Sequence, residues 1–435
     1  MKKLSTFQII VTGGFVFFTV IGILLFAGFG GTGGGGANVG QVTVWGTHDD
    51  RIINSILNEL SFDDSRFDQV TYIEKDSRSY DEELVEALAS GNGPDIFFLE
   101  QDTILRHKDK ISPIPYNVMS EREFKDTFIE EGELFLSVDG IIALPFIIDP
   151  MILYWNRDHY AQAGISRPPQ FWDELLSLSL NGVLTTRGEG GAILKSAFSI
   201  GEYQNIAHAK ELLSTIMLQA GGSPTIKNED GSLSSGLLRR FNDGQTPTEN
   251  TLRFYTDFAN PAKSVYTWNR ALPEAKQTFV SGILSNYIGF ASELPSIREK
   301  NANLNFDVAL VPQVRSSGNS ITYGKLTGLA ITEASPNIAG AMQIALALTK
   351  DLALQKVSEE ISLAPVSRTL LLERPSDPFK AIFADSALQS RAWLDPNAND
   401  TDLIFKTMIE SVVSGRARVN EAVNTANQEL ENLLR

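Results

Sequence analysis

The chain has 435 residues, of which 43% are hydrophobic and 21% are charged. This length exceeds what one simple hydrophobic core organises, so two lobes or domains are expected. The absence of cysteine excludes disulfides, thiolate metal sites, cysteine nucleophiles and lipid attachment to cysteine. A formal net charge of −16 without a basic stripe argues against nucleic acid as a partner, because phosphate contacts need clustered Lys and Arg.

Near the N-terminus, an apolar stretch from Phe7 to Phe29 follows two lysines. About 20 apolar residues cross the ~30 Å core of a bilayer, and no small-residue cleavage site follows this stretch. We therefore expect residues 1–29 to form an uncleaved signal anchor, a single transmembrane helix, and the glycine-rich residues 30–40 to form a flexible tether. The lysines would keep the N-terminus in the cytoplasm and place the remainder outside the cell or in the periplasm. A cleaved signal peptide is the alternative.

Strands alternate with helices in the first sixty residues after the tether. Apolar and β-branched runs predict strands at 42–45, 70–73 and 96–99, and the third run is uninterrupted, as in a strand buried on both faces. Helical spacing of apolar residues predicts a helix over 52–60, and a capping-box pattern predicts another after Ser79. This order predicts an α/β fold with a parallel sheet covered by helices.

The alternation continues towards the C-terminus with less regularity. Two strands are expected on either side of Asp149-Pro150, at 141–146 and 151–155, and the polar segment 223–248 is expected to be a surface insertion. Further strands are expected at 284–290, 306–311 and 326–331, and further helices at 207–219, 248–259, 271–281, 337–349, 351–361, 402–413 and 417–434.

Several short motifs follow one another after the tether: Val42–Trp45, Ala87–Gly91 with Gly93–Ile96, Leu144-Pro145 before Tyr154–Asp158, Ala163–Ile165 and Pro168–Glu174, Phe279–Gly282 before Tyr287–Gly289, and Gly415 with Asn420–Val423. In this order and spacing they resemble the family 1 extracellular solute-binding proteins, the group that includes maltose-binding protein. The resemblance covers nearly the whole chain after the tether.

This resemblance implies a two-lobed α/β fold of the type 2 periplasmic-binding kind, in which the lobes close over a ligand by hinge bending. The first lobe would comprise 41–147 and 326–366, and the second 148–325 and the C-terminal helices of 367–435. It further implies a monomer without a cofactor, which delivers its ligand to the permease subunits of an ABC importer.

Candidate site residues are sought just after the strands, because ligands gather beyond the carboxyl ends of strands in open parallel sheets. By resemblance, Thr47, Asp49 and Asp50 match ligand-contacting positions, although an aspartate here would also cap the following helix. Trp45, at the strand end, is a further candidate. A metal at His48 and the aspartates is not expected, since no second histidine lies at ligand spacing.

Two carboxylates of the resembling family match Asp102 and Asp149, the first of them a group that contacts sugar hydroxyls. The position after Asp102, often arginine in that family, is Thr103 here, which speaks against a maltose-like specificity. Asp149 is alternatively a solvated turn residue. Ser292 and Glu293 follow the strand at 284–290, where the family often has an aromatic platform, and we take both as candidates.

Trp268 and Trp393 lie in polar, irregular segments, where an indole is either a platform for a pyranose ring or an anchor for the loop. Asn205 and Tyr323 belong to segments that are further candidates for the lining of the cleft.

A sugar or oligosaccharide is the favoured ligand, because carboxylates form strong charge-assisted hydrogen bonds to hydroxyls. A polyamine or other cation is the alternative, since Asp49, Asp102, Asp149 and Glu293 together could neutralise it. Phosphate or sulfate is disfavoured because such a cleft is acidic. A membrane-anchored glycoside hydrolase would need two carboxylates ~5–9 Å apart, a distance that sequence does not show. No nucleophile elbow, histidine pair or phosphate loop supports an enzyme.

Overall fold

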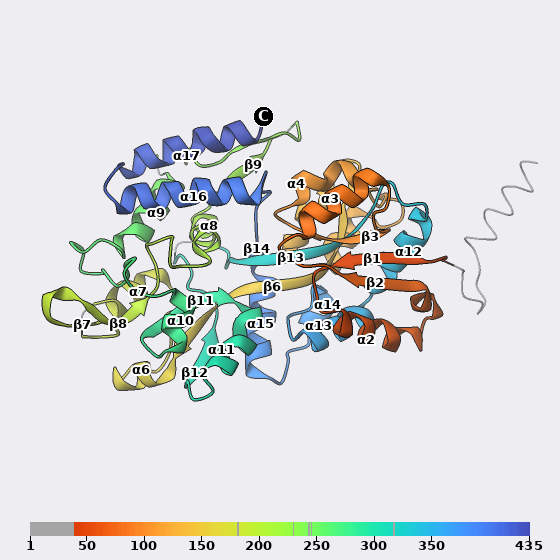
Figure 1. Ribbon diagram of the computed structural model, residues 1–435. Helices are drawn as coiled ribbons and strands as arrows, with labels where there is room; N and C mark the ends of the chain where they lie inside the picture. Colours follow the sequence, from red (N-terminus) through yellow and green to blue (C-terminus); the bar gives the residue numbers. More distant parts are fainter. Residues whose placement is uncertain (1–38, 181, 229, 242–243, 245, 316–317) are drawn as a thin grey trace, which may run out of the picture.

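The structure, a computed structural model, describes residues 39–180, 182–228, 230–241, 244, 246–315 and 318–435. Two lobes lie side by side, and the long strands β6 (Ala143–Asn156) and β13 (Thr322–Ile331) run from one to the other (Figure 1). One continuous path of paired strands links both lobes, in the order β2-β1-β3-β13-β6-β11-β8-β7. The two-lobed α/β fold is therefore as predicted.

The predicted anchor over 1–29 and most of the predicted tether over 30–40 lie outside the described residues. From Val39 onward, the described helices include none that is long and apolar enough to cross a membrane. The side chain of Val39 is only 4% exposed, and its carbonyl accepts a hydrogen bond of 2.8 Å from the Asn337 amide. The folded first lobe thus begins two residues before the expected start at residue 41.

The first lobe is a parallel sheet of β1 (Val42–Gly46), β2 (Val70–Glu74) and β3 (Ile96–Glu100), to which β13 is added in the antiparallel direction. The three predicted strands are confirmed. Four of the five β3 residues are buried, which explains the uninterrupted apolar run, because helices cover both faces of this sheet. The flanking helices α2 (Asp50–Ser61) and α3 (Tyr80–Ser90) follow β1 and β2.

The second lobe is built on the second half of β6. That half pairs in the antiparallel direction with β11 (Leu284–Phe290) and β12 (Phe306–Ala309), and β8 (Ile193–Phe198) lies parallel to β11. Helix α8 (Ala209–Gln219), which is buried on most sides, packs against β13 where that strand reaches this lobe. The helices α16 and α17 lie along the outer edge of the lobe (Figure 1).

The remaining elements of the described chain are shorter or peripheral. Their bounds are α4 (Ile104–His107), α5 (Glu121–Thr127), β4 (Leu136–Ser137), β5 (Gly140–Ile141), α6 (Arg157–Gln162), α7 (Trp172–Leu178), β7 (Thr186–Arg187), β9 (Thr225–Lys227), β10 (Leu233–Ser235), α9 (Pro247–Asp257), α10 (Ala275–Val280), α11 (Leu294–Lys300), α12 (Ile338–Leu348), α13 (Asp351–Ile361), α14 (Arg368–Leu371), α15 (Pro378–Leu388), β14 (Ser390–Arg391), α16 (Ala398–Val413) and α17 (Val419–Leu433), with 3₁₀ turns at Ser65–Gln69, Lys108–Lys110, Glu130–Phe135, Glu189–Gly191 and Ala291–Glu293.

A single strand replaces the two that the sequence predicted around Asp149-Pro150. β6 pairs with β13 as far as Pro150, which is opposite Gly324, and with β11 from Met151 onward. Proline cannot donate a hydrogen bond to a neighbouring strand, so it is tolerated at the point where the strand changes partners. Pro150 therefore marks the passage between the lobes rather than a turn.

The chain leaves the first lobe later than residue 366. Helix α14 still belongs to that lobe, because the Arg368 guanidinium donates hydrogen bonds of 3.0 and 2.6 Å to the carbonyls of Lys125 and Phe128. The next helix, α15, packs against β6 and β12 and begins the return to the second lobe.

Candidate ligand-binding cleft

A cavity of about 740 Å³ lies where the carboxyl ends of β1, β3 and β11 meet the two crossing strands. Its volume is in the range of sites that hold small molecules. Both lobes contribute to the lining: His48, Glu100, Gln101, Ile147, Asp149, Ala291, Ser292, Leu294, Pro295, Arg298, Lys325, Thr327, Ile361, Ser362, Leu363, Asp377, Phe379, Lys380 and Phe383. The position agrees with the expectation that ligands bind beyond strand ends.

Asp149 and Lys325 are opposite each other on the crossing strands and both line the cavity. The Asp149 carboxylate accepts a hydrogen bond of 2.9 Å from the backbone N–H of Ser292, which ties the hinge strand to the end of β11. Burial raises the pKa of Asp149 to about 6, against the lowering effect of the Ser292 hydrogen bonds and the Lys325 charge. Asp149 is thus a carboxylate that changes charge close to neutral pH.

On the first-lobe side, the cavity is bounded by the residues that follow β1 and β3. The backbone of His48 both donates to and accepts from the Tyr72 hydroxyl, at 3.0 and 2.8 Å, and burial lowers the pKa of its imidazole. The side-chain amide of Gln101 accepts a 2.7 Å hydrogen bond from the Leu326 N–H, and this contact holds the end of β3 against β13. Burial raises the pKa of Glu100, while Lys325 opposes the shift.

The candidates that follow β1 lie outside the cavity lining. Asp49 caps helix α2 and forms an ion pair with the exposed Arg51, so the capping alternative describes its contacts. The Asp50 N–H donates a 2.9 Å hydrogen bond to Glu74. Carboxylate oxygens of Asp49, Asp50 and Glu74 lie within 4.8 Å of one another on the surface.

Trp45 and Thr47 are half-buried next to this group. The Lys75 ammonium lies 3.8 Å from the centroid of a Trp45 ring, so a cation from β2's end covers the indole.

Glu293 is occupied by its own protein neighbours. Its carboxylate accepts hydrogen bonds of 2.9 Å from the His208 imidazole and from the Phe290 N–H, and it forms a 3.0 Å ion pair with Lys276. Burial alone would raise its pKa, but the His208 hydrogen bond and charge, together with Lys276, hold the pKa at about 2. The sequence analysis takes Glu293 as an acid that a ligand can contact. In the structure, its charge is already balanced by protein groups inside the second lobe.

Asn205 and Trp268, two candidate cleft residues, contact each other inside the second lobe. The Trp268 side chain is 0% exposed, and its indole N–H donates a 3.0 Å hydrogen bond to the Asn205 side chain. The amide of Asn205 also donates to the carbonyls of Asn269 and Leu272. Trp268 therefore has no exposed face in this structure, and its contacts are those of the loop-anchor interpretation.

Asp102, Tyr323 and Trp393 also lie outside the lining of this cavity. Trp393 is buried and stacks on Phe405, with ring centroids 6.1 Å apart, so its contacts are those of the loop-anchor interpretation. Tyr323 is buried where β13 pairs with β14. Burial raises the pKa of Asp102 to about 7, and one of its carboxylate oxygens has no hydrogen-bond partner among the described residues.

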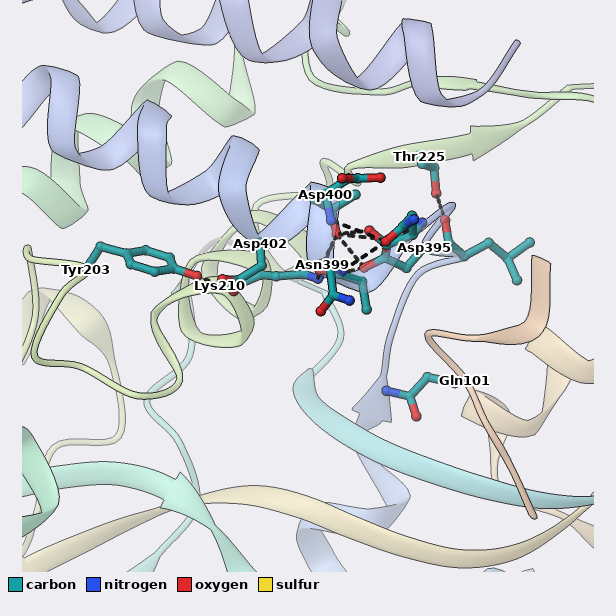
Figure 2. A network of polar contacts seen from close by, with 12 residues as sticks. Gln101, Tyr203, Lys210, Thr225, Asp395, Asn399, Asp400 and Asp402 are labelled. Carbon is teal, nitrogen blue, oxygen red and sulfur yellow. Dashed lines mark hydrogen bonds and ion pairs between the residues drawn. The ribbon is translucent and has the colours of Figure 1, made fainter. Parts of the chain in front are cut away.

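A charged network in the second lobe includes Asp395 and Lys210, whose charges act on the pKa of Asp102. Lys210 on α8 forms a buried 2.7 Å ion pair with Asp395 and donates a 2.8 Å hydrogen bond to the Thr401 hydroxyl, while Tyr203 donates to Asp402 (Figure 2). These contacts join α8 to the start of α16.

Of the residues that the sequence selected, the structure therefore brings Asp149 and Ser292 to the cavity. Sequence reasoning missed Glu100, Arg298, Lys325, Phe379 and Lys380. The strand-end rule that selected Asp102 applies equally to Glu100, but helix α15, which supplies Phe379 and Lys380, was not predicted at all.

The fold is shared with several solved solute-binding proteins. A solute-binding protein of an ABC transporter from Thermotoga lettingae, bound to α-D-tagatose, is 19% identical with a TM-score of 0.66, covering 91% of this chain and 100% of the other. A cyclo/maltodextrin-binding protein complexed with maltotetraose is 16% identical with a TM-score of 0.73, covering 93% and 99%. A cyclic α-maltosyl-1,6-maltose-binding protein from Arthrobacter globiformis is 17% identical with a TM-score of 0.73, covering 91% and 98%.

No curated protein sequence matches this chain. The model of one protein family, described as bacterial extracellular solute-binding protein, matches residues 67–383. That match covers well over half of the chain and spans both lobes and the crossing strands. The protein therefore belongs to the bacterial extracellular solute-binding protein family, a family of binding proteins rather than enzymes.

Proposed function

We propose that this protein captures a sugar or oligosaccharide outside the cytoplasm in the interlobe cavity and delivers it to an ABC-type importer. The observation that supports this most directly is a cavity of about 740 Å³ that both lobes and both crossing strands line. Structural neighbours with the same fold bind tagatose, maltotetraose and a cyclic maltosyl-maltose.

The crossing strands supply a physical route for closure. β6 and β13 are paired with each other at the passage and with different partners in each lobe, so bending there moves whole sheets as rigid units. Asp149 and Glu100 provide acceptors for sugar hydroxyls, and Phe379 and Phe383 provide apolar surface for the ring. Binding then favours the closed arrangement, because only that arrangement offers both sets of groups at once.

Membrane attachment and assembly form part of the same proposal. An anchor at 1–29 with a glycine tether would keep the receptor within a few nanometres of the permease, and a monomer suffices because one chain contributes both walls of the cavity.

Isothermal titration calorimetry of the full-length protein with maltotetraose, tagatose and a panel of other sugars tests the proposal. For a sugar that binds, Asp149→Asn should weaken the affinity about tenfold, because the charge-assisted hydrogen bond is lost while an oxygen remains to accept from Ser292. Wild-type affinity should also fall as the pH drops through about 6, where Asp149 takes up a proton, and the variant should lack that decline.

Asp139→Asn is the matched control, since Asp139 is exposed and lies outside the cavity lining. Heat with spermidine and none with any sugar would overturn the proposal in favour of the cation alternative. An Asp149→Asn variant with unchanged affinity but a much lower melting temperature would show that Asp149 acts on stability alone.

A further inference from the structure

The acidic cleft that the sequence suggested does not form. Three of the acids behind that expectation have protein partners or lie outside the lining: Asp49 pairs with Arg51, Glu293 with His208 and Lys276, and Asp102 lies outside the cavity. The described cavity lining instead contains three acidic side chains and three basic ones, in addition to His48. The reason for disfavouring an anionic ligand is therefore removed.

The acids and cations are not distributed evenly over the lining. On the crossing-strand side, Lys325 is the cavity cation whose charge acts on the pKa of both Glu100 and Asp149. Its ammonium also lies 4.3 Å from the centroid of the Phe290 ring. Lys325 thus shares its part of the cavity with two carboxyl groups.

The wall formed by α11 and α15 has the opposite balance. Arg298 and Lys380 line the cavity there, and within the described ranges neither forms an ion pair with a carboxylate. The Arg298 guanidinium lies over the Phe379 ring, 4.5 Å from its centroid. Such stacking fixes the orientation of a guanidinium while leaving its N–H donors free at the edges.

Asp377 is the acid of this wall, and its carboxylate is used locally. One of its oxygens accepts hydrogen bonds from the backbone N–H groups of Phe379 and Lys380, at 2.7 and 3.2 Å, as the N-cap of α15. The carboxylate therefore satisfies the helix terminus rather than either cationic side chain. Two cations remain on one wall of a concave site without a partner of opposite charge.

We propose that the ligand is a sugar that carries an anionic group, a carboxylate or a phosphate, which Arg298 and Lys380 bind. This inference rests on the proposed function and narrows its substrate class. The hydroxyls of the same sugar reach Glu100 and Asp149 on the crossing strands, so the two walls recognise different parts of one ligand. A guanidinium beside an ammonium matches the planar or tetrahedral oxygens of either anion.

The test compares matched pairs of probes by calorimetry on the full-length protein: glucose with glucuronate, galactose with galacturonate, and glucose with glucose 6-phosphate. At least one anionic member should bind about tenfold or more tightly than its neutral partner, and the difference should shrink as salt is raised. The affinities for the two uronates and for glucose 6-phosphate show whether a carboxylate or a phosphate is preferred.

Arg298→Met and Lys380→Met should each weaken the anionic probe about tenfold and leave the neutral partner unchanged. Lys406→Met is the control, because Lys406 is exposed on α16 and outside the cavity. Melting temperatures of all three variants should stay close to the wild type, since the altered side chains are not buried.

Neutral sugars that bind as tightly as their anionic partners would overturn this inference and leave the proposed function standing. Inorganic phosphate or acetate binding as tightly as the anionic sugars would overturn it as well, since the site would then recognise the anion alone. If no sugar binds, neutral or anionic, the result would count against the proposed function itself.

Discussion

Two neighbouring residues of β13, Gly324 and Lys325, separate two very different environments. Lys325 is exposed and lines the cavity, where its positive charge acts on the pKa of Glu100 and of Asp149. Gly324 is buried and lies against the carboxyl group of Glu131, so close that a Cβ at Gly324 would be 2.3 Å from Glu131 Oε2. Successive residues of a strand point to opposite sides, so one hinge strand presents a charged residue to the cavity on one side and a buried residue to Glu131 on the other, packed side.

Glu131 is the residue that makes the packed side unusual. Its side chain is 1% exposed, and neither of its carboxyl oxygens has a hydrogen-bond partner among the described residues. Burial raises the pKa of Glu131 to about 8, and the charge of Arg391 offsets only part of that effect, because Arg391 forms its ion pair with Glu130. The comparison teaches that charge on the cavity side is available to a ligand, whereas charge on the packed side is suppressed by desolvation.

The strongest test of this contrast removes the ionisable group on the packed side. In the folded state Glu131 binds its proton more tightly than in the unfolded state, where its pKa is near 4.5. Stability from this group is therefore fully present below about pH 4.5 and is lost as the pH rises towards about 8. At about 1.4 kcal/mol per pKa unit, the loss is on the order of 5 kcal/mol.

Glu131→Gln cannot ionise, so its melting temperature should exceed that of the wild type at pH 8 and above and approach it at pH 5. Thermal melts of both proteins across this pH range measure the difference. Glu123→Gln, at an exposed position on α5, serves as the control and should follow the wild-type curve. Parallel curves for wild type and Glu131→Gln would show that Glu131 is hydrated or paired.

A smaller loss is expected from filling the space at Gly324. In Gly324→Ala the new Cβ would meet the side-chain ends of Glu131, at Oε2, and of Ile148, at Cδ1, so these two buried side chains must move from their present positions. Overpacking of this kind costs about 1–3 kcal/mol. Chemical denaturation measures it, with Gly318→Ala as the control, because nothing lies within 4 Å of a Cβ there. Equal midpoints for the two variants would mean that the packed side is looser than described.

The last test concerns the two buried tryptophans, which separate an indole N–H with a hydrogen-bond partner from one without. Trp268→Phe leaves the side-chain oxygen of Asn205 without its 3.0 Å donor and should cost about 1–3 kcal/mol beyond the change in packing. The indole N–H of Trp393 has no partner among the described residues, so Trp393→Phe removes an unsatisfied donor and should cost less. Denaturation midpoints of the pair check this order, and a larger loss for Trp393→Phe would contradict it.

Local features of the fold were predictable because they depend on residues near one another in the chain. The strands at 42–45, 70–73 and 96–99 and the helix at 351–361 follow from apolar spacing alone. Helix α15 was not predicted, because its apolar residues do not form a single face. Such a sequence lacks the helical periodicity that identifies an amphipathic helix. Pro150 misled the prediction for β6, because its position between two pairing partners is a property of the whole sheet.

Thus the sequence by itself determined the strand and helix alternation and, through its resemblance, the two-lobed class. The resemblance also selected Asp149, and the position after a strand selected Ser292, both of which line the cavity. Only the tertiary structure decided which charges remain available to a ligand. The partners that neutralise Glu293 and the aromatic ring that orients Arg298 lie 17 to 85 residues away in the chain. Burial and charge balance depend on such distant neighbours, and no local pattern records them.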